Sequence, residues 1–510
     1  MSSAIPHFVR LGFEKPRRFF SSPTATRSLI SSPVFRFGPP RSGGFKFGLG
    51  RCSLKRFSVP MATFDENSLV VSTVIEESNG ICGGMSSSMP SPSDGEDRDT
   101  ELLVYPSVDV DLPINKDRVE APDPSLAVTG HHVATLQQGR KRRRIQTGIL
   151  INMGLIAFSA VFLLFFDWCS WRIIRQPLKP FLLMHPFTLS AFLSAFAGYL
   201  YVPIVDGMKI HQILRKEGPT THSSKRGTPT MGGLFFIPIG VFVARVIAGG
   251  NSIQLDGAAV ATFAFAIIGL LDDLLSCIKS HNYGLPGWVK LSLQVAVGTW
   301  FSFWLDSSSI STPYNMKWLV PLPPPFGLVC LGKFYLILTA FCFAAMGNGV
   351  NLTDGLDGLA GGSAALAFVA MSVTVLAICP ELAVFGASMA GACIGFLFHN
   401  GYKASIFMGD TGSLALGGAL AAMAACTGMF FPLFIASGIF VMEVLSVIIQ
   451  VLSVKITKRL YGTSRRVFRM APVHHHFELC GLKEPIIVAS AYVISYILAM
   501  LAGYIGLISA

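Results

Sequence analysis

The residues best suited to chemistry lie in an Asn-, Asp- and Gly-rich run, residues 347–360, which joins two apolar segments. Asn351, Asp354 and Asp357 follow one another at steps of three residues, so a helical turn would place them roughly on one side. The glycines of the run would let a bulky anionic ligand approach backbone N–H groups. A plain connector between two helices has a similar composition, and this run alone leaves both interpretations open.

Two further polar clusters lie at the ends of other apolar segments. Lys225–Gly233 combines cations, hydroxyls and glycines just before an apolar segment, which suits a phosphate at a helix N-terminus. Its alternative is a basic loop that serves membrane topology alone. Asp272 and Asp273 end another segment, where carboxylates oppose the helix dipole. Because this placement is electrostatically unfavourable, it suggests that the two carboxylates bind a cation or transfer a proton. The alternative is that they form salt bridges with nearby lysines.

The remaining two clusters follow later in the chain. Asn400 precedes the run Phe407–Gly412, in which Asp410 is a lone carboxylate just before an apolar segment, although Asp is also a common N-cap. The run Phe468–Glu478 contains three consecutive histidines, which cannot all ligate one ion comfortably, so a zinc site is not expected. These histidines could bind a pyrophosphate or shuttle protons, or form a simple surface run. They are His474, His475 and His476.

Oxygen ligands and phosphate-binding cations, without a Cys/His set, point to a hard ion, Mg²⁺ or alternatively Mn²⁺. Mg²⁺ usually takes one or two carboxylates together with ligand phosphates, which leaves other acids for proton transfer or orientation. The inferred reaction is phosphoryl transfer from a soluble donor that carries a pyrophosphate to an acceptor dissolved in the membrane.

Composition indicates what must position these residues. Of the 510 residues, 51% are hydrophobic and 14% are charged, which is typical of a polytopic membrane protein. The net charge of +11 comes from a leader and particular loops, without a basic surface that alternates with aromatics, so nucleic acid is not an expected partner. The ten cysteines are scattered and form no disulfide or metal pattern.

The pattern predicts an all-α polytopic membrane protein with a ten-helix core and a possible extra N-terminal membrane helix. The ten expected core segments are 186–205, 231–248, 257–275, 288–305, 330–346, 359–378, 381–399, 412–427, 430–454 and 486–507. The extra apolar run, 147–166, is long enough to cross the bilayer or could lie in its interface.

Alternating the sides of these segments divides the connectors into two groups. One face receives residues 206–230, 272–287, 347–358, 400–411 and 455–485, which hold nearly all the basic residues of the core connectors. By the positive-inside rule this face is cytoplasmic, or stromal in a plastid. Because all five polar clusters fall on the same face, we expect them to form one site.

The N-terminal part divides by charge. Residues 1–60 are rich in Arg and Ser with a single acid, which resembles a transit peptide, plastid rather than mitochondrial, with a disordered tail as the alternative. Residues 61–144 form an acidic linker that ends in a basic knot. Residues 145–185 hold the extra segment and a connector, and residues 186–510 form the core.

The clusters resemble, in order and spacing, those of the MraY family of phospho-N-acetylmuramoyl-pentapeptide transferases. The resemblance covers about residues 186–507, and the run Ala471–Glu478 is its most specific motif. It implies transfer of phospho-MurNAc-pentapeptide from UDP-MurNAc-pentapeptide to a polyprenyl phosphate, with release of UMP, formation of lipid I and use of Mg²⁺. It also implies a homodimer in a lipid bilayer.

The resemblance further implies roles for individual residues. Asp410 would ligate Mg²⁺, and Asp272 would be the base on the lipid phosphate with Asp273 beside it. The catalytic set also includes Asp357 and the histidines His474, His475 and His476. The substrate-contacting set is Lys225, Thr230, Asn351, Asp354, Gly355, Leu356, Asn400 and Phe407. A direct attack by the lipid phosphate and a covalent aspartyl intermediate both stay open.

The sequence departs from the family in its N-terminal extension, the segment 147–166 and Lys403, where the family often has proline. Two charges inside apolar segments, Arg245 and Glu443, are expected to serve packing or dimerisation, because neither lies near the connectors of the polar face. Two alternative functions are transfer of N-acetylhexosamine phosphate from UDP-GlcNAc, and membrane transport. A transporter would place ionisable residues near mid-membrane rather than at helix ends on one face.

Overall fold

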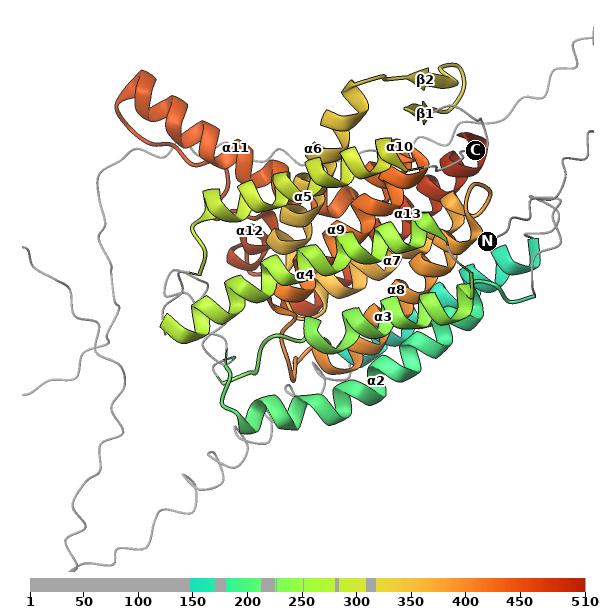
Figure 1. Cartoon of the computed structure of the whole chain (residues 1–510). Helices are drawn as coiled ribbons and strands as arrows, with labels where there is room; N and C mark the ends of the chain where they lie inside the picture. Colours follow the sequence, from blue (N-terminus) through green and yellow to red (C-terminus); the bar gives the residue numbers. More distant parts are fainter. Residues whose placement is uncertain are drawn as a thin grey trace, which may run out of the picture. The chain divides into compact units, whose positions relative to one another are not determined.

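The computed structural model describes residues 147–169, 180–211, 225, 227–250, 252–279, 284–308 and 318–509. The predicted transit peptide and the acidic linker lie outside these residues. The described part is almost entirely helical, and Figure 1 shows the long helices running side by side. A short antiparallel hairpin, β1 (Leu319–Pro321) and β2 (Leu328–Cys330), interrupts the helices before α6.

Three helices form the centre of the bundle: α7 (Leu359–Val375), α8 (Pro380–Asn400) and α9 (Gly409–Thr427). Every residue of α7 is buried, and α8 and α9 are buried over nearly all of their length. Their sequences are rich in Ala, Gly and Ser, and such small residues let helices approach closely where lipid offers no hydrophobic drive for association. Gly391 of α8 is one such residue, because it lies against the backbone of Phe187.

The other helices surround this centre. α2 (Met184–Gly207) and α3 (Gly233–Ala248) pack on α8, and α4 (Ile253–Lys279) packs on α9. α6 (Phe334–Thr353) lies between α9 and α5 (Gly287–Ser307), and α13 (Glu484–Ser509) covers α7. The polar ends of these helices therefore meet around the same central elements.

The extra N-terminal segment is a helix, Thr147–Cys169, long and apolar enough to cross a membrane. It packs on α13 through Phe158, whose ring meets that of Tyr496 edge-on. Gly148, near its start, stands against the backbone of Tyr402, and Asp167 near its end accepts N–H groups at the start of α2. This helix is therefore an integrated part of the bundle.

Seven of the described helices meet the length and composition of a membrane span, and two shorter helices are also apolar. The chain is a multi-pass membrane protein, as the sequence predicts. Each of the ten expected core segments contains a helix, but the segment 430–454 was wrongly drawn as one. It breaks at Ser437 into α10 (Phe430–Ala436) and α11 (Gly438–Tyr461), where α10 covers α7 and α13 while α11 leaves towards α6.

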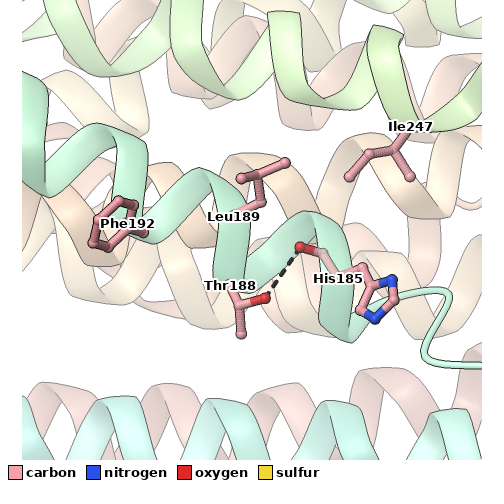
Figure 2. A pocket seen from close by; sticks show the side chains of 5 residues that line it. All are labelled: His185, Thr188, Leu189, Phe192 and Ile247. Atoms are coloured by element: carbon pink, nitrogen blue, oxygen red, sulfur yellow. Dashed lines mark hydrogen bonds between the residues drawn. The ribbon is translucent and has the colours of Figure 1, made fainter.

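An open groove lies between the first turns of α2 and the last turn of α3 (Figure 2). Its lining is His185, Thr188, Leu189, Phe192 and Ile247. The chain connects the end of α2 to the start of α3 through Lys225–Gly233, so this groove lies at the opposite end of both helices from that polar cluster.

Candidate active site

Two carboxylates from different helices meet around the ammonium of Lys290 in the first turn of α5. One oxygen of Asp272 lies 3.2 Å from Lys290 Nζ, and an oxygen of Asp410 is also paired with it. The other oxygen of Asp410 accepts a hydrogen bond from Asn351 Nδ2 at 2.7 Å. The side chains of Lys290, Asp272 and Asp410 are 13%, 14% and 27% exposed, so this cation cluster is largely removed from water.

Asp273, next to Asp272, serves the start of α9. Its carboxylate accepts the N–H groups of Asp410 and Thr411 at 3.0 and 2.9 Å, and the Thr411 hydroxyl at 2.7 Å. The first N–H groups of a helix have no partners within the helix. A carboxylate at that end accepts their hydrogen bonds, and its negative charge interacts favourably with the positive end of the helix dipole. Asp273 therefore fixes the turn that carries Asp410. Its predicted catalytic role stays a prediction.

Glycines allow the helix starts to come this close. Gly269 of α4 faces the backbone of Asp410, and a side chain there would overlap with it. Gly233 at the start of α3 likewise lies against Gly412, so the first turns of α3 and α9 touch. Because Cβ atoms at these positions would separate the helices, the small residues determine where Asp410 lies.

A second cluster lies around the ammonium of Lys225. Lys225 Nζ lies 2.8 Å from an oxygen of Asp357 and 2.6 Å from Oε1 of Glu484, the first residue of α13. The same Glu484 oxygen accepts the N–H of Asp357 at 2.7 Å. Burial by itself would lower the pKa of Lys225, but the attraction of Asp357 and Glu484 outweighs it and raises the pKa. Lys225 is therefore a firmly charged member of this trio.

The short connector between α6 and α7 is held from several sides. Asp357 accepts the N–H of Ala404 at 3.1 Å, and the N–H of Gly358 donates to Asn400 Oδ1 at 3.0 Å. The hydroxyl of Tyr492, from α13, donates to the carbonyl of Gly358 at 2.7 Å. Asp357 and Asn400, both predicted site residues, are 4% and 3% exposed, so they act here on protein partners.

Asp354, at the start of the same connector, differs from its neighbours. Asp354 is half-buried, and its carboxylate forms no hydrogen bond or ion pair with any described residue. Burial and the charges of Asp410, Asp273 and Asp357 raise its pKa to about 8. A carboxyl group with that pKa beside a cation cluster can hold or release a proton near neutral pH.

The three residues at three-residue steps do not share one face, contrary to the expectation for a helical turn. α6 ends at Thr353, so Asn351 is on the helix and faces Asp410, whereas Asp357 is on the connector and faces Lys225. The acidic pair was also placed wrongly at a helix end, because α4 continues for two more turns to Lys279.

The histidine run lies on a short helix, α12 (Val473–Leu479), and its three side chains have different surroundings. His474 is 2% exposed, with its Nε2 edge against Gly355 and its Nδ1 3.2 Å from a Glu443 oxygen. His475 Nδ1 pairs with Glu478 at 2.7 Å. His476 accepts the N–H of Arg469 at 3.2 Å. Through this contact with Gly355, His474 meets the Asn- and Asp-rich connector.

The other predicted substrate-contacting residues are close to the same helix starts. Thr230 is buried, and its N–H donates to the carbonyl of Ile210 at 3.3 Å. The N–H of Phe407 donates to the carbonyl of Pro229 at 2.8 Å, which joins the clusters Lys225–Gly233 and Phe407–Gly412. Leu356 is buried within the connector. The five clusters therefore do meet at one place, while the individual substrate contacts stay predictions.

The cation cluster offers a donor set that fits Mg²⁺. Its oxygen donors are the carboxylates of Asp272 and Asp410, and a positive group, the Lys290 ammonium, already lies between them. Among the described residues no three acidic, His or Cys side chains converge to form a complete metal cage. Such an arrangement is typical of Mg²⁺ that one or two carboxylates and the ligand's phosphates hold together.

Sequence comparisons agree with this geometry. Residues 225–237 match signature 1 of phospho-N-acetylmuramoyl-pentapeptide-transferase, and residues 256–428 match glycosyl transferase family 4. A phospho-N-acetylmuramoyl-pentapeptide-transferase of Trichormus variabilis is 42% identical over 355 residues, which cover 70% of this chain and 95% of that protein. The chain belongs to this transferase family.

Other members of the family give the same result. A protein of the same name from Nostoc sp. is 42% identical over 353 residues, covering 69% of this chain and 94% of its own length. One from Nostoc punctiforme is 39% identical over 379 residues, covering 74% and 97%. The match to the family therefore spans nearly the whole length of these bacterial relatives. Because a match over 74% of this chain must begin before residue 147, it includes the helix Thr147–Cys169, and the expectation that segment 147–166 departs from the family is wrong for these relatives.

Three residues of the site were missed or misjudged in the sequence. Lys290 and Glu484 each stand at the start of an otherwise apolar segment, where a charge usually marks the membrane boundary. Glu443 was expected to serve packing or dimerisation, but α12 folds back so that His474 reaches it. Only Glu443 carried a usable sign, because it is a lone charge inside an apolar segment, where the membrane makes a charge costly.

Proposed function

We propose that the chain transfers phospho-MurNAc-pentapeptide from UDP-MurNAc-pentapeptide to a polyprenyl phosphate, releasing UMP and forming lipid I. The observation that carries the proposal is that Asp272 and Asp410 meet around the Lys290 ammonium near the ends of membrane helices, while Asn351 donates a hydrogen bond to Asp410. The names of the bacterial relatives supply the substrate class. A bilayer-embedded bundle with a polar end suits a reaction between a soluble donor and a lipid acceptor.

Within this proposal Asp410 and Asp272 would hold Mg²⁺, with Asn351 orienting Asp410. When bound, Mg²⁺ would neutralise the charge on the donor's pyrophosphate and stabilise the leaving phosphate. Lys290 would add a second positive charge to the same oxygens. Asp272 was expected to be the base on the acceptor phosphate, but it pairs with Lys290, so Asp354 in its deprotonated form is proposed as a second candidate to take that proton, with a pKa raised to about 8.

The proposal is tested by replacing the central carboxylate. Asp410→Ala should abolish Mg²⁺-dependent UMP release from UDP-MurNAc-pentapeptide in a lipid extract. Asp256→Ala, which removes an exposed Asp in the first turn of α4 at the other end of that helix, is the matched control and should keep wild-type turnover. Wild-type UMP release by the Asp410 variant would refute the proposed site.

The donor and the location need separate tests. Competition between UDP-MurNAc-pentapeptide and UDP-GlcNAc should show transfer from the former, and equal use of both would favour the hexosamine-phosphate alternative. We also propose a plastid membrane location with the site facing the stroma, supported by the composition of residues 1–60 and the cyanobacterial relatives. A reporter fused to residues 1–60 that stays cytosolic would refute it. The proposed homodimer is checked by mass measurement in detergent.

A further inference from the structure

We infer that Glu484 is a positioning residue of the transferase site, which acts by holding the Lys225 ammonium and the Asp357 backbone together. Glu484 belongs to none of the five polar clusters that the sequence singles out, and it lies five residues beyond α12. The activity readouts below depend on the proposed function, whereas the labelling readout does not.

The geometry is that of a shared acceptor. A single Glu484 oxygen, Oε1, accepts both the Lys225 ammonium at 2.6 Å and the Asp357 N–H at 2.7 Å. Lys225 also donates to Asp357 Oδ1 at 2.8 Å, which closes a triangle of three groups. The side chains of Lys225, Glu484 and Asp357 are only 13%, 12% and 2% exposed, so water competes little for these contacts.

Glu484 joins three parts of the chain that are distant in sequence. Lys225 belongs to the segment before α3, Asp357 to the connector between α6 and α7, and Glu484 to the start of α13. Without the Glu484 carboxylate, Lys225 would keep one of its two partners and the Asp357 N–H would lose its acceptor. Glu484 is therefore the member of the trio that fixes the backbone of the connector.

The connector is short, so the position of Asp357 affects the position of Asp354. Asp354 is three residues before Asp357, and α6 and α7 hold the connector at either end. A displaced Asp357 would therefore shift Asp354, whose carboxylate has no described partner to keep it in place. Loss of Glu484 should impair turnover more than donor binding, because it disturbs a reacting group rather than a binding surface.

The first experiment separates turnover from binding in the full chain purified in detergent. Glu484→Gln keeps the size and leaves an amide oxygen for the Asp357 N–H, but it removes the charge that holds Lys225 against it, so it should lower kcat about 10- to 100-fold while the donor KM changes little. Glu381→Gln is the matched control, because Glu381 is in the first turn of α8 at the end remote from Asn400. It should leave both constants unchanged. Wild-type kcat in Glu484→Gln would overturn the inference.

A double-mutant cycle tests whether Glu484 acts through Lys225. In a Lys225→Met background the Glu484→Gln substitution should lower kcat much less than it does in the wild type, because the charged partner of Glu484 is already absent. An equal loss in both backgrounds would overturn the inference. If Glu484→Gln does not fold, Glu484→Asp replaces it in the test. Glu484→Asp keeps the charge on a shorter side chain, so its kcat should lie between that of the wild type and that expected for Glu484→Gln. Wild-type kcat in Glu484→Asp would then contradict it.

Lysine labelling provides a readout independent of activity. Acetylation with a soluble succinimidyl ester, followed by mass spectrometry, should modify Lys225 slowly in the wild type because its ammonium is paired and mostly buried. Glu484→Gln should speed labelling of Lys225 several-fold, and Glu381→Gln should not. Unchanged labelling would overturn the inference. A wild-type protein without transferase activity would instead refute the proposed function and leave this test intact.

Discussion

Lys290 offers the most direct test of how the cation cluster is built. Lys290→Met keeps the length of the side chain and removes the ammonium between Asp272 and Asp410. All three side chains are at least 70% buried, and removing one partner of a buried ion pair costs about 3–5 kcal/mol. The variant should therefore unfold at a lower temperature than the wild type when EDTA is present. Added Mg²⁺ should restore part of the loss, because it can take the position between the two carboxylates.

Turnover measures the second role of the same residue. If Lys290 also stabilises charge on the phosphates, kcat should fall about 10²–10³-fold even at saturating Mg²⁺. Lys333→Met is the matched control, since Lys333 is exposed at the start of α6 and pairs with no described acid. Thermal melts in detergent with and without Mg²⁺, together with UMP release, give both quantities. Wild-type stability in EDTA and wild-type kcat for Lys290→Met would refute the account.

Three further outcomes are expected. Because the pKa of Asp354 is raised to about 8, its negative charge develops as the pH rises towards 8 and strengthens the attraction for Mg²⁺ at Asp410, so calorimetric Mg²⁺ affinity should rise with pH and level off above 8. Metal-free stability should fall as the pH rises through 8, since the folded state holds that proton more tightly than the unfolded chain, and Asp354→Asn should remove both trends. Gly269→Val should abolish activity by displacing the backbone of Asp410, whereas Gly154→Ala, which meets no neighbour, should not. Glu443→Gln should lower kcat about tenfold, and it should add little in a His474→Gln background, because the two side chains are paired.

The helical core could be predicted from the sequence because lipid imposes strong rules on length and apolarity. Each expected core segment contains a helix, and the polar clusters meet at one place as their common face suggested, although Asp272 and Asp273 lie inside α4 rather than at its end. The break at Ser437 was missed because the run 430–454 stays apolar throughout. Only the packing of α10 on α7 and α13 reveals why the chain turns there. Apolarity gives the length of a segment, while its direction depends on neighbours far away in sequence.

The sequence predicted which residues belong to the site better than it predicted which of them contact one another. The sequence pointed to Asp272, Asn351 and Asp410, and these do lie together around Lys290. It offered no way to know that Asp273 would cap α9 while its neighbour faces a cation. The partners of Lys225 were equally hidden, because Glu484 lies 259 residues away from it. Such contacts depend on three-dimensional packing, which spacing along one segment does not report.

The helix Thr147–Cys169 has a practical consequence for anyone who shortens the protein. Its Gly148 stands against Tyr402 and its Asn152 against Gly401, within three residues of the Ala404 N–H that Asp357 accepts. A version that starts at residue 186 would contain every segment of the ten-helix core yet lack the wall behind that turn. Kinetic constants from such a truncation would describe an unsupported loop, so comparisons with bacterial enzymes should use a chain that begins before residue 147.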